Sequence, residues 1–186
     1  MKLKSIVISS AVILFVLIIL RVLWFLFVSS GGVFSLMPNP PTPEITYGEF
    51  PINITYEING EIKKIEDIII CEYDGVDDRG SAGKYRKWKS NLKSGNEYLT
   101  LLKGNDGNVT FEIRISYGSP DYYMGDLRYN SQEAYEKMLF NKDLNYIQWE
   151  NGVQTGKILT EDEVLEKYKL KIVDVQYSPP IQNSFK

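Results

Sequence analysis

The sequence predicts an α+β fold, with an N-terminal transmembrane helix followed by one mainly antiparallel β domain that carries two short helices. Three patterns lead to this prediction. Residues 6–28 are apolar apart from two serines and Arg21. Runs of alternating apolar and polar residues then flank Asn59-Gly60 and Asn151-Gly152, dipeptides that favour two-residue β-hairpins. Two short amphipathic segments with helix-capping patterns lie among the later strands, as is typical of an α+β domain.

The apolar segment 6–28 is long enough to cross a bilayer, because about 23 helical residues that rise about 1.5 Å each reach about 34 Å. Its apolar residues occupy every face of the helix, so no polar stripe is left to meet water. Arg21 lies about two turns from the outer end and can extend its charge to the headgroups. We therefore expect the lipid bilayer to be the partner of residues 6–28.

The flanking charges predict how this helix is oriented. Lys2 and Lys4 precede it, and no Lys or Arg follows it until Lys63. Basic residues that flank a membrane helix stay on the cytoplasmic side. Residues 1–5 are therefore expected in the cytoplasm, and the C-terminal domain of this single-pass cell-membrane protein is expected to be extracytoplasmic.

A cleaved signal peptide is the alternative interpretation of the same segment. Residues 6–20 would then form its apolar region, and the small residues at 28–32 offer a cleavage site. Both interpretations place most of the chain outside the cytoplasm. They differ in whether the helix keeps the protein at the membrane as a signal anchor.

Residues 29–43 are predicted to form a Pro-rich extracytoplasmic linker. Four of the seven residues from Met37 to Pro43 are proline, which favours an extended spacer and ends any helix. The β-rich domain is expected to occupy residues 44–186. A domain of this size forms a single hydrophobic core.

The first half of this domain is expected to contain two hairpins. Residues 50–58 and 61–73 flank Asn59-Gly60, whose positive φ values suit a type I′ turn. The second hairpin pairs residues 98–103 with residues 109–117 through a connection at 104–107. Apolar side chains are expected inward in both hairpins: Ile52, Ile54, Tyr56, Ile58, Val109, Phe111, Ile113, Ile115 and Tyr117.

The second half is expected to combine helices with a third hairpin. Asn130–Glu133 has capping-box spacing and precedes a helix that buries Ala134, Tyr135, Met138 and Leu139. A hairpin through Asn151-Gly152 follows. Thr160–Glu163 then caps a helix that ends near Tyr168 and turns Val164, Leu165 and Tyr168 inward, and residues 170–177 form the last strand.

Composition excludes several classes of function. Three of the 21 basic residues lie in the first 28 positions, which leaves 18 basic against 24 acidic side chains and a net charge of −6 beyond them. Such a domain is a poor binder of nucleic acid, so no nucleic-acid partner is expected. The chain has no His, which removes His-based nucleophile pairs and zinc sites, and we expect no cofactor. Cys71, the single cysteine, lies in an apolar run and is expected in the core.

Five stretches together resemble an uncharacterised family of small membrane-anchored extracytoplasmic proteins of Gram-positive bacteria. The similarity covers residues 43–186. It implies a setting at the bacterial cell envelope, and it brings no activity, cofactor or catalytic residue. The stretches that carry the resemblance are Ile45–Pro51, Cys71–Gly75, Gly83–Lys89, Tyr122–Asp126 and Tyr177–Lys186.

A basic and aromatic cluster is the preferred candidate for ligand binding. It consists of Lys84, Tyr85, Arg86, Lys87, Trp88 and Lys89. Its cations can pair with phosphate or carboxylate, and its two rings can offer flat faces to a sugar. An anionic wall polymer, a lipid headgroup or a partner membrane protein would supply such groups. The structural alternative is an edge strand whose lysines deter aggregation while the two rings pack inward.

Two groups of acidic residues are weaker candidates. Asp74, Asp77 and Asp78 share a glycine-bearing segment and could hold calcium, although their spacing is not that of an EF-hand and a solvated turn is the alternative. Asp121 and Asp126 flank a Tyr-Tyr-Met-Gly stretch, and paired carboxylates can hydrolyse glycosidic bonds. The leading hypothesis is thus a non-enzymatic binding module at the membrane surface, with a membrane-tethered carboxylate hydrolase as the alternative.

Overall fold

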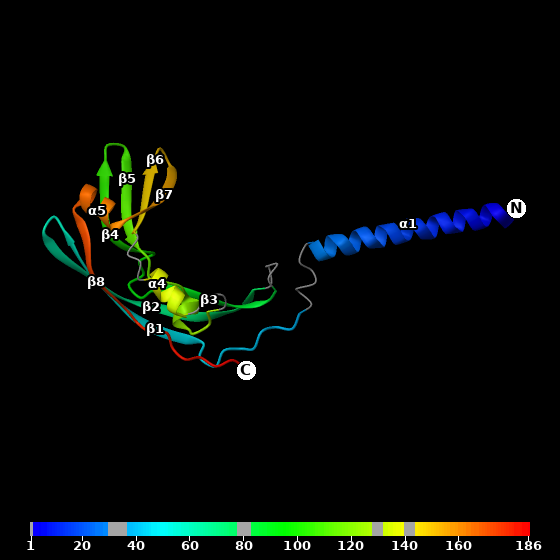
Figure 1. Cartoon of the computed structure of the whole chain (residues 1–186), viewed down its shortest axis with the longest axis horizontal. Coiled ribbons are helices and arrows are strands. Elements are labelled where there is room, and N and C mark those ends of the chain that lie inside the picture. The colour runs from blue at the N-terminus through cyan, green and yellow to red at the C-terminus, as the bar shows by residue number, and fades with distance from the viewer. Residues whose placement is uncertain (1, 30–36, 78–82, 128–131, 140–143) are drawn as a thin grey trace. The chain divides into compact units, whose positions relative to one another are not determined.

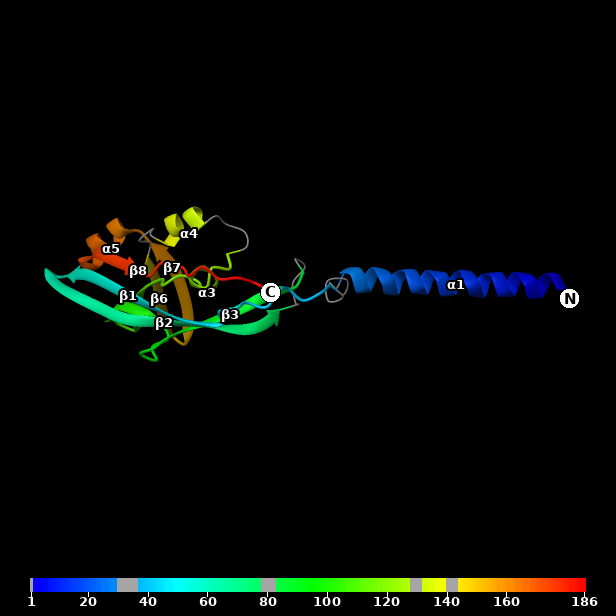
Figure 2. The ribbon, with the colours of Figure 1, turned by 90° about the horizontal axis from the view of Figure 1, so that it is seen from below.

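The computed structural model describes residues 2–29, 37–77, 83–127, 132–139 and 144–186, without the side chains of residues 2–12, 132, 138 and 139. These residues form two compact units. One unit comprises Met1–Pro41 and Gly75–Lys87, and the other comprises Thr42–Asp74 and Trp88–Lys186. The larger unit holds nearly all of the secondary structure that follows α1 (Figures 1 and 2).

The chain contains four helices and eight strands among its described residues. The helices are α1 (Lys2–Ser29), α3 (Pro120–Tyr123), α4 (Gln132–Leu139) and α5 (Glu161–Tyr168). The strands are β1 (Tyr47–Ile58), β2 (Glu61–Asp77), β3 (Tyr85–Leu92), β4 (Leu99–Asp106), β5 (Val109–Ile115), β6 (Leu144–Glu150), β7 (Val153–Leu159) and β8 (Leu170–Tyr177).

Helix α1 spans 28 residues and contains no acidic residue in its first turn. Its large apolar side chains from Ile13 to Val28 are exposed. Over the described residues, no helix combines the length and the apolar character that membrane crossing requires.

The strands form two four-stranded sheets, and the fold is therefore α+β with mostly antiparallel pairing. The first sheet has the order β3-β2-β1-β8, and the second has the order β4-β5-β6-β7. Hairpins between consecutive strands were predictable from the sequence, because each depends on a local turn. The division into two sheets was not, because β8 pairs with the distant β1 instead of continuing from β7.

Two of the three predicted turns are confirmed. Asn59 and Gly60 have φ values of 53° and 83°, and Asn151 and Gly152 have φ values of 50° and 79°. Positive φ at both central residues is the geometry of a type I′ turn, which matches the twist of the paired strands. The turns therefore fix the register of β1 on β2 and of β6 on β7.

The connection predicted at residues 104–107 is wrong in position. Strand β4 runs on to Asp106, and the turn consists of Gly107 and Asn108. Gly104 lies within the strand opposite Phe111, where an added Cβ would lie 2.3 Å from Phe111 Cζ. This glycine thus makes room for an aromatic ring instead of forming a turn.

Helix α5 begins and ends as predicted. The side-chain oxygen of Thr160 accepts a hydrogen bond from the N–H of Glu163, and the Glu163 carboxylate accepts one from the N–H of Thr160, which completes a capping box. Val164 is buried, as expected, whereas Leu165 is exposed and was wrongly predicted to point inward.

Helix α4 buries Tyr135, although Ala134 is exposed and the cap predicted at residues 130–131 lies outside the described residues.

Helix α3 is a single turn that is not among the two helices predicted from the sequence. Ser119 caps it by accepting a hydrogen bond from the N–H of Tyr122, and Pro120 occupies its first turn, where a missing N–H has no cost. The turn places Tyr122 and Tyr123 in the core. Tyr123 packs on Phe50 with ring centroids 4.9 Å apart and donates a hydrogen bond to the Tyr117 carbonyl oxygen.

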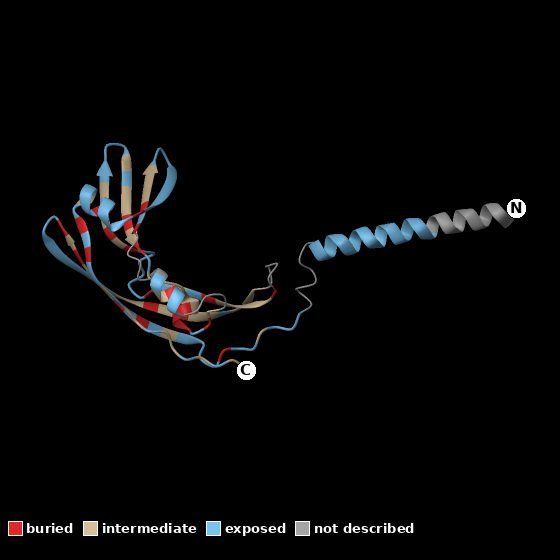
Figure 3. Cartoon of the chain, viewed as in Figure 1, coloured by how far each residue is buried: buried red, intermediate tan, exposed pale blue. Residues whose placement is uncertain are grey.

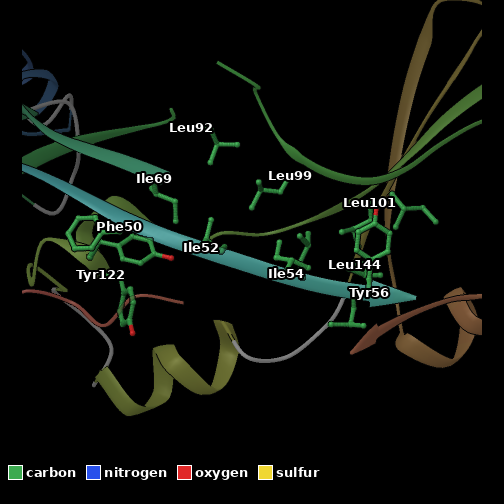
Figure 4. Packing of buried hydrophobic residues seen from close by; sticks show 14 of the residues in the cluster. Phe50, Ile52, Ile54, Tyr56, Ile69, Leu92, Leu99, Leu101, Tyr122 and Leu144 are labelled. Carbon is green, nitrogen blue, oxygen red and sulfur yellow. The ribbon is translucent and has the colours of Figure 1, made fainter. Parts of the chain in front are cut away.

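The core is one cluster that joins the inner faces of both sheets. The predicted row on β1 is confirmed, and Figure 4 places Ile52, Ile54 and Tyr56 along that strand in one cluster with residues of the second sheet such as Leu101 and Leu144. Cys71 belongs to the same cluster, as predicted. Burial, assisted by the nearby Asp121, raises the pKa of the Cys71 thiol to about 12, so the thiol stays protonated at neutral pH.

The two ends of the larger unit are bound to each other. Thr42 and Lys186 exchange two backbone hydrogen bonds of 2.8 and 3.0 Å, and Pro43 forms an isolated bridge with Phe185. The side-chain amide of Asn183 accepts from the N–H of Ile45 at 3.0 Å and donates to its carbonyl oxygen at 2.8 Å. The last residues of the Pro-rich segment are therefore part of this unit.

Candidate functional site

The basic cluster is divided between the two units, because the boundary falls between Lys87 and Trp88. In the smaller unit, Lys84 Nζ donates to the side-chain oxygen of Asn39 at 3.1 Å, and Arg86 Nη1 donates to the carbonyl oxygen of Pro41 at 3.3 Å. Both cations thus contact the Pro-rich segment. The side chains of Tyr85 and Lys87 are half-buried.

The remaining two residues of the cluster lie in the larger unit. Trp88 is 7% exposed, and its ring packs edge-on against Tyr73 in the core. Its flat face is therefore not open to a sugar. Lys89 is exposed and forms an ion pair of 3.0 Å with Glu72, and the hydrogen bond to this carboxylate raises the pKa of Lys89. Strand β3 is the edge of its sheet, as the structural alternative for this cluster requires.

The two carboxylates proposed for catalysis have different surroundings. Asp126 is 5% exposed, and it accepts a hydrogen bond of 2.8 Å from Trp88 Nε1. Asp121 is half-buried in the first turn of α3. A hollow of about 350 Å³ lies beside them and is lined by Tyr122, Gly125 and the segment 180–183, but by neither carboxylate. The bond to Trp88 gives Asp126 a structural role.

The third acidic group lies mostly in a strand. Asp74 and Asp77 belong to β2 instead of to a loop, and Asp78 lies outside the described residues. Within the part of the chain that the structure describes, no three acidic or cysteine side chains come together in a way that could hold a metal ion.

The most developed polar surface lies on the second sheet, on the face opposite the core. Residues that pair across neighbouring strands share a face, so the register defines this outer face as three rows. The rows are Thr100–Arg114–Asn145–Ile158, Lys103–Glu112–Ile147–Gly156 and Asn105–Thr110–Trp149–Gln154. Arginine, carboxylate, amide and aromatic groups therefore lie side by side on this face of the sheet.

Arg114 lies in the first of these rows and is held on three sides. Its guanidinium carbon lies 3.6 Å from the ring centroid of Tyr98 and 5.5 Å from that of Trp149. Its Nε donates to the Glu112 carboxylate at 2.8 Å. The side chains of Arg114 and Glu112 are only 13% and 17% exposed. The guanidinium is therefore fixed in position before any ligand arrives.

Glu112 is the anion that balances this site. Its carboxylate forms an ion pair with Lys103, whose Nζ lies 2.9 Å from Glu112 Oε1, in addition to the bond from Arg114. Partial burial alone would raise the pKa of Glu112, but the hydrogen bonds from Lys103 and Arg114 outweigh it and lower this pKa. Glu112 is therefore ionised at neutral pH and holds both cations.

Two hollows meet at Tyr98 and Arg114. One has a volume of about 360 Å³ and is also lined by Asn96, Thr100 and Glu112. The other has a volume of about 420 Å³ and is also lined by Tyr117, Asn145, Ile147 and Gln154. Each volume is within the range of small-molecule sites, and the two shared residues make them neighbouring subsites.

Residue chemistry at these hollows favours an uncharged polar ligand. Lys103 and Arg114 are matched by Glu112 and by Glu97, whose hydrogen bond to Tyr98 raises the pKa of that tyrosine. No net charge remains to select an anion. Amide, hydroxyl and guanidinium groups can bind hydroxyl and carbonyl groups, and Tyr98 supplies a flat apolar surface to both hollows. Trp149 lines neither hollow, but its ring lies near Arg114.

The sequence pattern does not single out this site, because Glu112 and Arg114 are the polar residues of an ordinary alternating strand. Their alternation on β5 is indeed that of a strand with one face away from the core. The available signal was the placement of two aromatic residues, Tyr98 and Trp149, in the segments predicted to flank that strand. Only the register shows that both rings lie beside Arg114.

Comparison with known proteins adds no identification. No protein-family model matches this chain, and neither the curated proteins nor the solved structures provide a match.

Proposed function

We propose that this protein is a membrane-anchored, extracytoplasmic binding module whose outer face on the second sheet binds an uncharged glycan chain. This proposal rests mainly on one observation: Arg114 contacts both Tyr98 and Glu112 where the two hollows meet. A rigid, charge-balanced polar group between two subsites suits a polymer of neutral, hydrogen-bonding units.

A sugar ring matches the chemistry of this face. It has an apolar face of C–H groups and a rim of hydroxyl groups, so it can stack on Tyr98 or Trp149 while Arg114, Asn145 or Gln154 binds its rim. The ring of Tyr98 is 42% exposed and remains partly open, although Arg114 covers one side. Amide and carbonyl groups on an N-acetylated sugar would find both donors and acceptors here.

The proposed anchor is helix α1. It contains the apolar segment 6–28, and its first turn carries Lys2 and Lys4. Large apolar side chains from Ile13 to Val28 are exposed, and an apolar surface of this kind is favourable only against lipid or a partner. Retention by this helix would hold the glycan-binding face near the envelope.

Calorimetric titration of the full chain with a soluble four-ring oligomer of N-acetylglucosamine tests the ligand. The protein is kept in a polyoxyethylene detergent, because glycosidic detergents carry sugar headgroups that would compete. Tyr98→Ala and Trp149→Ala are each expected to weaken binding about tenfold, or about 1.4 kcal/mol. Tyr47→Ala is the matched control, since Tyr47 is a tyrosine on β1 of similar exposure, 48% against 42% for Tyr98, and it should leave the affinity unchanged.

The same titration distinguishes the glycan from the partners predicted for the basic cluster. Anionic vesicles and an anionic wall polymer replace the oligomer, with a second variant in which Lys84, Arg86, Lys87 and Lys89 are changed to Ser. Failure of the wild-type chain to bind the oligomer rejects the glycan proposal. Binding to the anionic ligands that is lost in the serine variant would instead assign the function to the basic cluster.

Protease digestion of intact cells tests the anchor and its orientation. A tag at the C-terminus should be cleaved by protease added outside, while a tag at the N-terminus is protected until the cells are lysed. The chain should also remain in the membrane fraction at full length. A protected C-terminal tag, or a soluble chain shortened near residue 30, would refute the proposed anchorage.

A further inference from the structure

We propose that β7 is a docking edge for the β7 strand of a second copy of this chain, so that two second sheets join into one continuous antiparallel sheet. Strand β7 is the last strand of its sheet over the described residues. All but the last of its residues are exposed, as Figure 3 shows.

The edge of β7 is unusually regular. Strand β4 and strand β8 each have a register shift in their pairing, and β3 carries lysines, features that discourage the addition of a strand. Strand β7 pairs with β6 over seven residues without a shift and contains no proline. Val153 and Ile158 on this edge are 61% and 66% exposed.

Hairpin geometry identifies the backbone groups that face outward. In a two-residue hairpin, the residues that flank the turn exchange both backbone hydrogen bonds, and these pairs alternate along the ladder. Glu150 and Val153 flank the turn here. The N–H and C=O groups of the alternate residues Gln154, Gly156 and Ile158 therefore point away from β6, toward the open edge.

A two-fold axis at Gly156 pairs every one of these groups. Gly156 then lies opposite its copy, and Gln154 lies opposite the second copy's Ile158, so all three positions are hydrogen-bonded pairs. An isologous contact of this kind closes as a dimer and cannot continue into a fibre. No other residue of β7 provides an axis that uses all three outward-facing positions.

Side chains on β7 are compatible with this register. Thr155 would lie opposite the second copy's Lys157, and Val153 would lie opposite its Leu159. Like charges do not face each other directly. Lys157 itself turns toward the inner face, where its Nζ lies 5.6 Å from the ring centroid of Tyr146 and lines a hollow with Glu163 and Glu166. Its charge therefore remains balanced beside the added strand.

Cysteine cross-linking of the full chain in detergent tests both the contact and its register. Positions 154 and 158 of two copies would have Cα atoms about 5.5 Å apart, within the range of a disulfide. Like positions would be about 13 Å apart along the strand. Mild oxidation of a mixture of Gln154→Cys and Ile158→Cys should therefore give a covalent dimer, whereas either variant alone should give none.

Gly156→Pro provides the blocking variant. Proline removes the outward N–H at the centre of the contact and leaves the ladder to β6 intact. Added to each cysteine variant, it should abolish the cross-linked dimer while the circular dichroism spectrum stays unchanged. Dimer formation that persists with this proline, or that is equal for a single cysteine variant and for the mixture, overturns the proposal. So does a wild-type chain whose mass in detergent stays at the monomer value of 21.4 kDa across micromolar concentrations.

Discussion

The indole N–H of Trp88 donates a hydrogen bond of 2.8 Å to the buried carboxylate of Asp126. Sequence analysis had placed these residues in two different candidate sites, a basic ligand-binding cluster and a pair of catalytic acids. Their bond joins β3 to the segment after α3, across 38 positions of the chain. Both residues thus contribute to the core, and their bond gives Trp88 and Asp126 a structural role.

Removal of this bond should be costly, because it leaves a buried polar group without that partner. We expect Asp126→Ala to lower the free energy of unfolding by about 1–3 kcal/mol. In a double-mutant cycle with Trp88→Phe, the two changes should couple by about 1.5–3 kcal/mol, as for a hydrogen bond to a charged group. Chemical denaturation followed by circular dichroism measures both quantities.

Asp174→Asn is the matched control for that cycle. The Asp174 carboxylate also accepts a side-chain hydrogen bond, from Gln176 at 2.9 Å, but both residues are exposed on β8. Its substitution should change the free energy of unfolding by less than about 0.5 kcal/mol. An Asp126→Ala cost as small as that of the control would show that the buried bond does not stabilise the fold.

Three buried acids and the half-buried Tyr177 should make the fold sensitive to alkaline pH. Burial is the largest cause that raises the pKa of Cys71 and of Tyr177, each to about 12, and it also raises the pKa values of Tyr122 and Tyr123. The folded chain then keeps protons that an unfolded chain releases near about pH 8.5 for the thiol and near about pH 10 for the tyrosines. The contribution of these groups to the free energy of unfolding should be constant below about pH 8.5 and fall as the pH rises toward about 12.

Tyrosinate absorption and the denaturation midpoint, measured together, test this expectation. The buried tyrosines should ionise only as the fold is lost, so the late part of the absorption change should coincide with unfolding. Tyr123→Phe removes one of these groups and should make the alkaline decline shallower. Ionisation of all tyrosines in one step near pH 10, with the fold intact, would contradict the assigned burial.

Local signals in the sequence were sufficient for most of the secondary structure. Asn-Gly at residues 59–60 and 151–152 specified two turns, because few dipeptides accept positive φ twice, and Thr160 with Glu163 specified the start of α5. The number of sheets could not be predicted, since it depends on which distant strand β8 joins. The Arg114 site was missed for a related reason, because Tyr98 lies just before β4 and Trp149 lies on β6, and the register of these two strands on β5 was unknown.

Gly104 shows how a turn residue can be misread, and its substitution should be costly. An added Cβ would lie 2.3 Å from the ring of Phe111, so Gly104→Ala should lower the free energy of unfolding by about 1–3 kcal/mol through overpacking. The double variant Gly104→Ala/Phe111→Leu should be less destabilised than the sum of the two single variants. Additive losses in chemical denaturation would mean that the ring is not the obstacle.

Acid should weaken the fold through Glu112. Although burial raises the pKa of Glu112, the bonds from Lys103 and Arg114 lower it below the unfolded value of about 4.3. The stability from these bonds is therefore present above about pH 4.3 and is lost as the pH falls through the folded pKa. Glu112→Gln should lower the denaturation midpoint at pH 7 and make the acid decline shallower.

The control for Glu112 is Glu61→Gln, an exposed position at the start of β2. It should leave both the midpoint at pH 7 and the slope of the acid decline unchanged. If the two variants behave alike, the ion pairs of Glu112 with Lys103 and Arg114 make no measurable contribution to the fold.

Asn183 should determine how firmly the two ends of the larger unit are held together. Its amide both accepts from the N–H and donates to the C=O of Ile45, so one side chain takes the place of a paired strand residue. Asn183→Ala removes both bonds, at about 0.5–1.5 kcal/mol each, and should speed hydrogen exchange at the Ile45 amide about tenfold or more. Asn183→Asp keeps only the acceptor and should give an intermediate rate. The control is hydrogen exchange at the backbone amide of Ile54, within β1, which should be the same in the wild-type chain and in both variants. An unchanged exchange rate at the Ile45 amide in the alanine variant would exclude this role for Asn183.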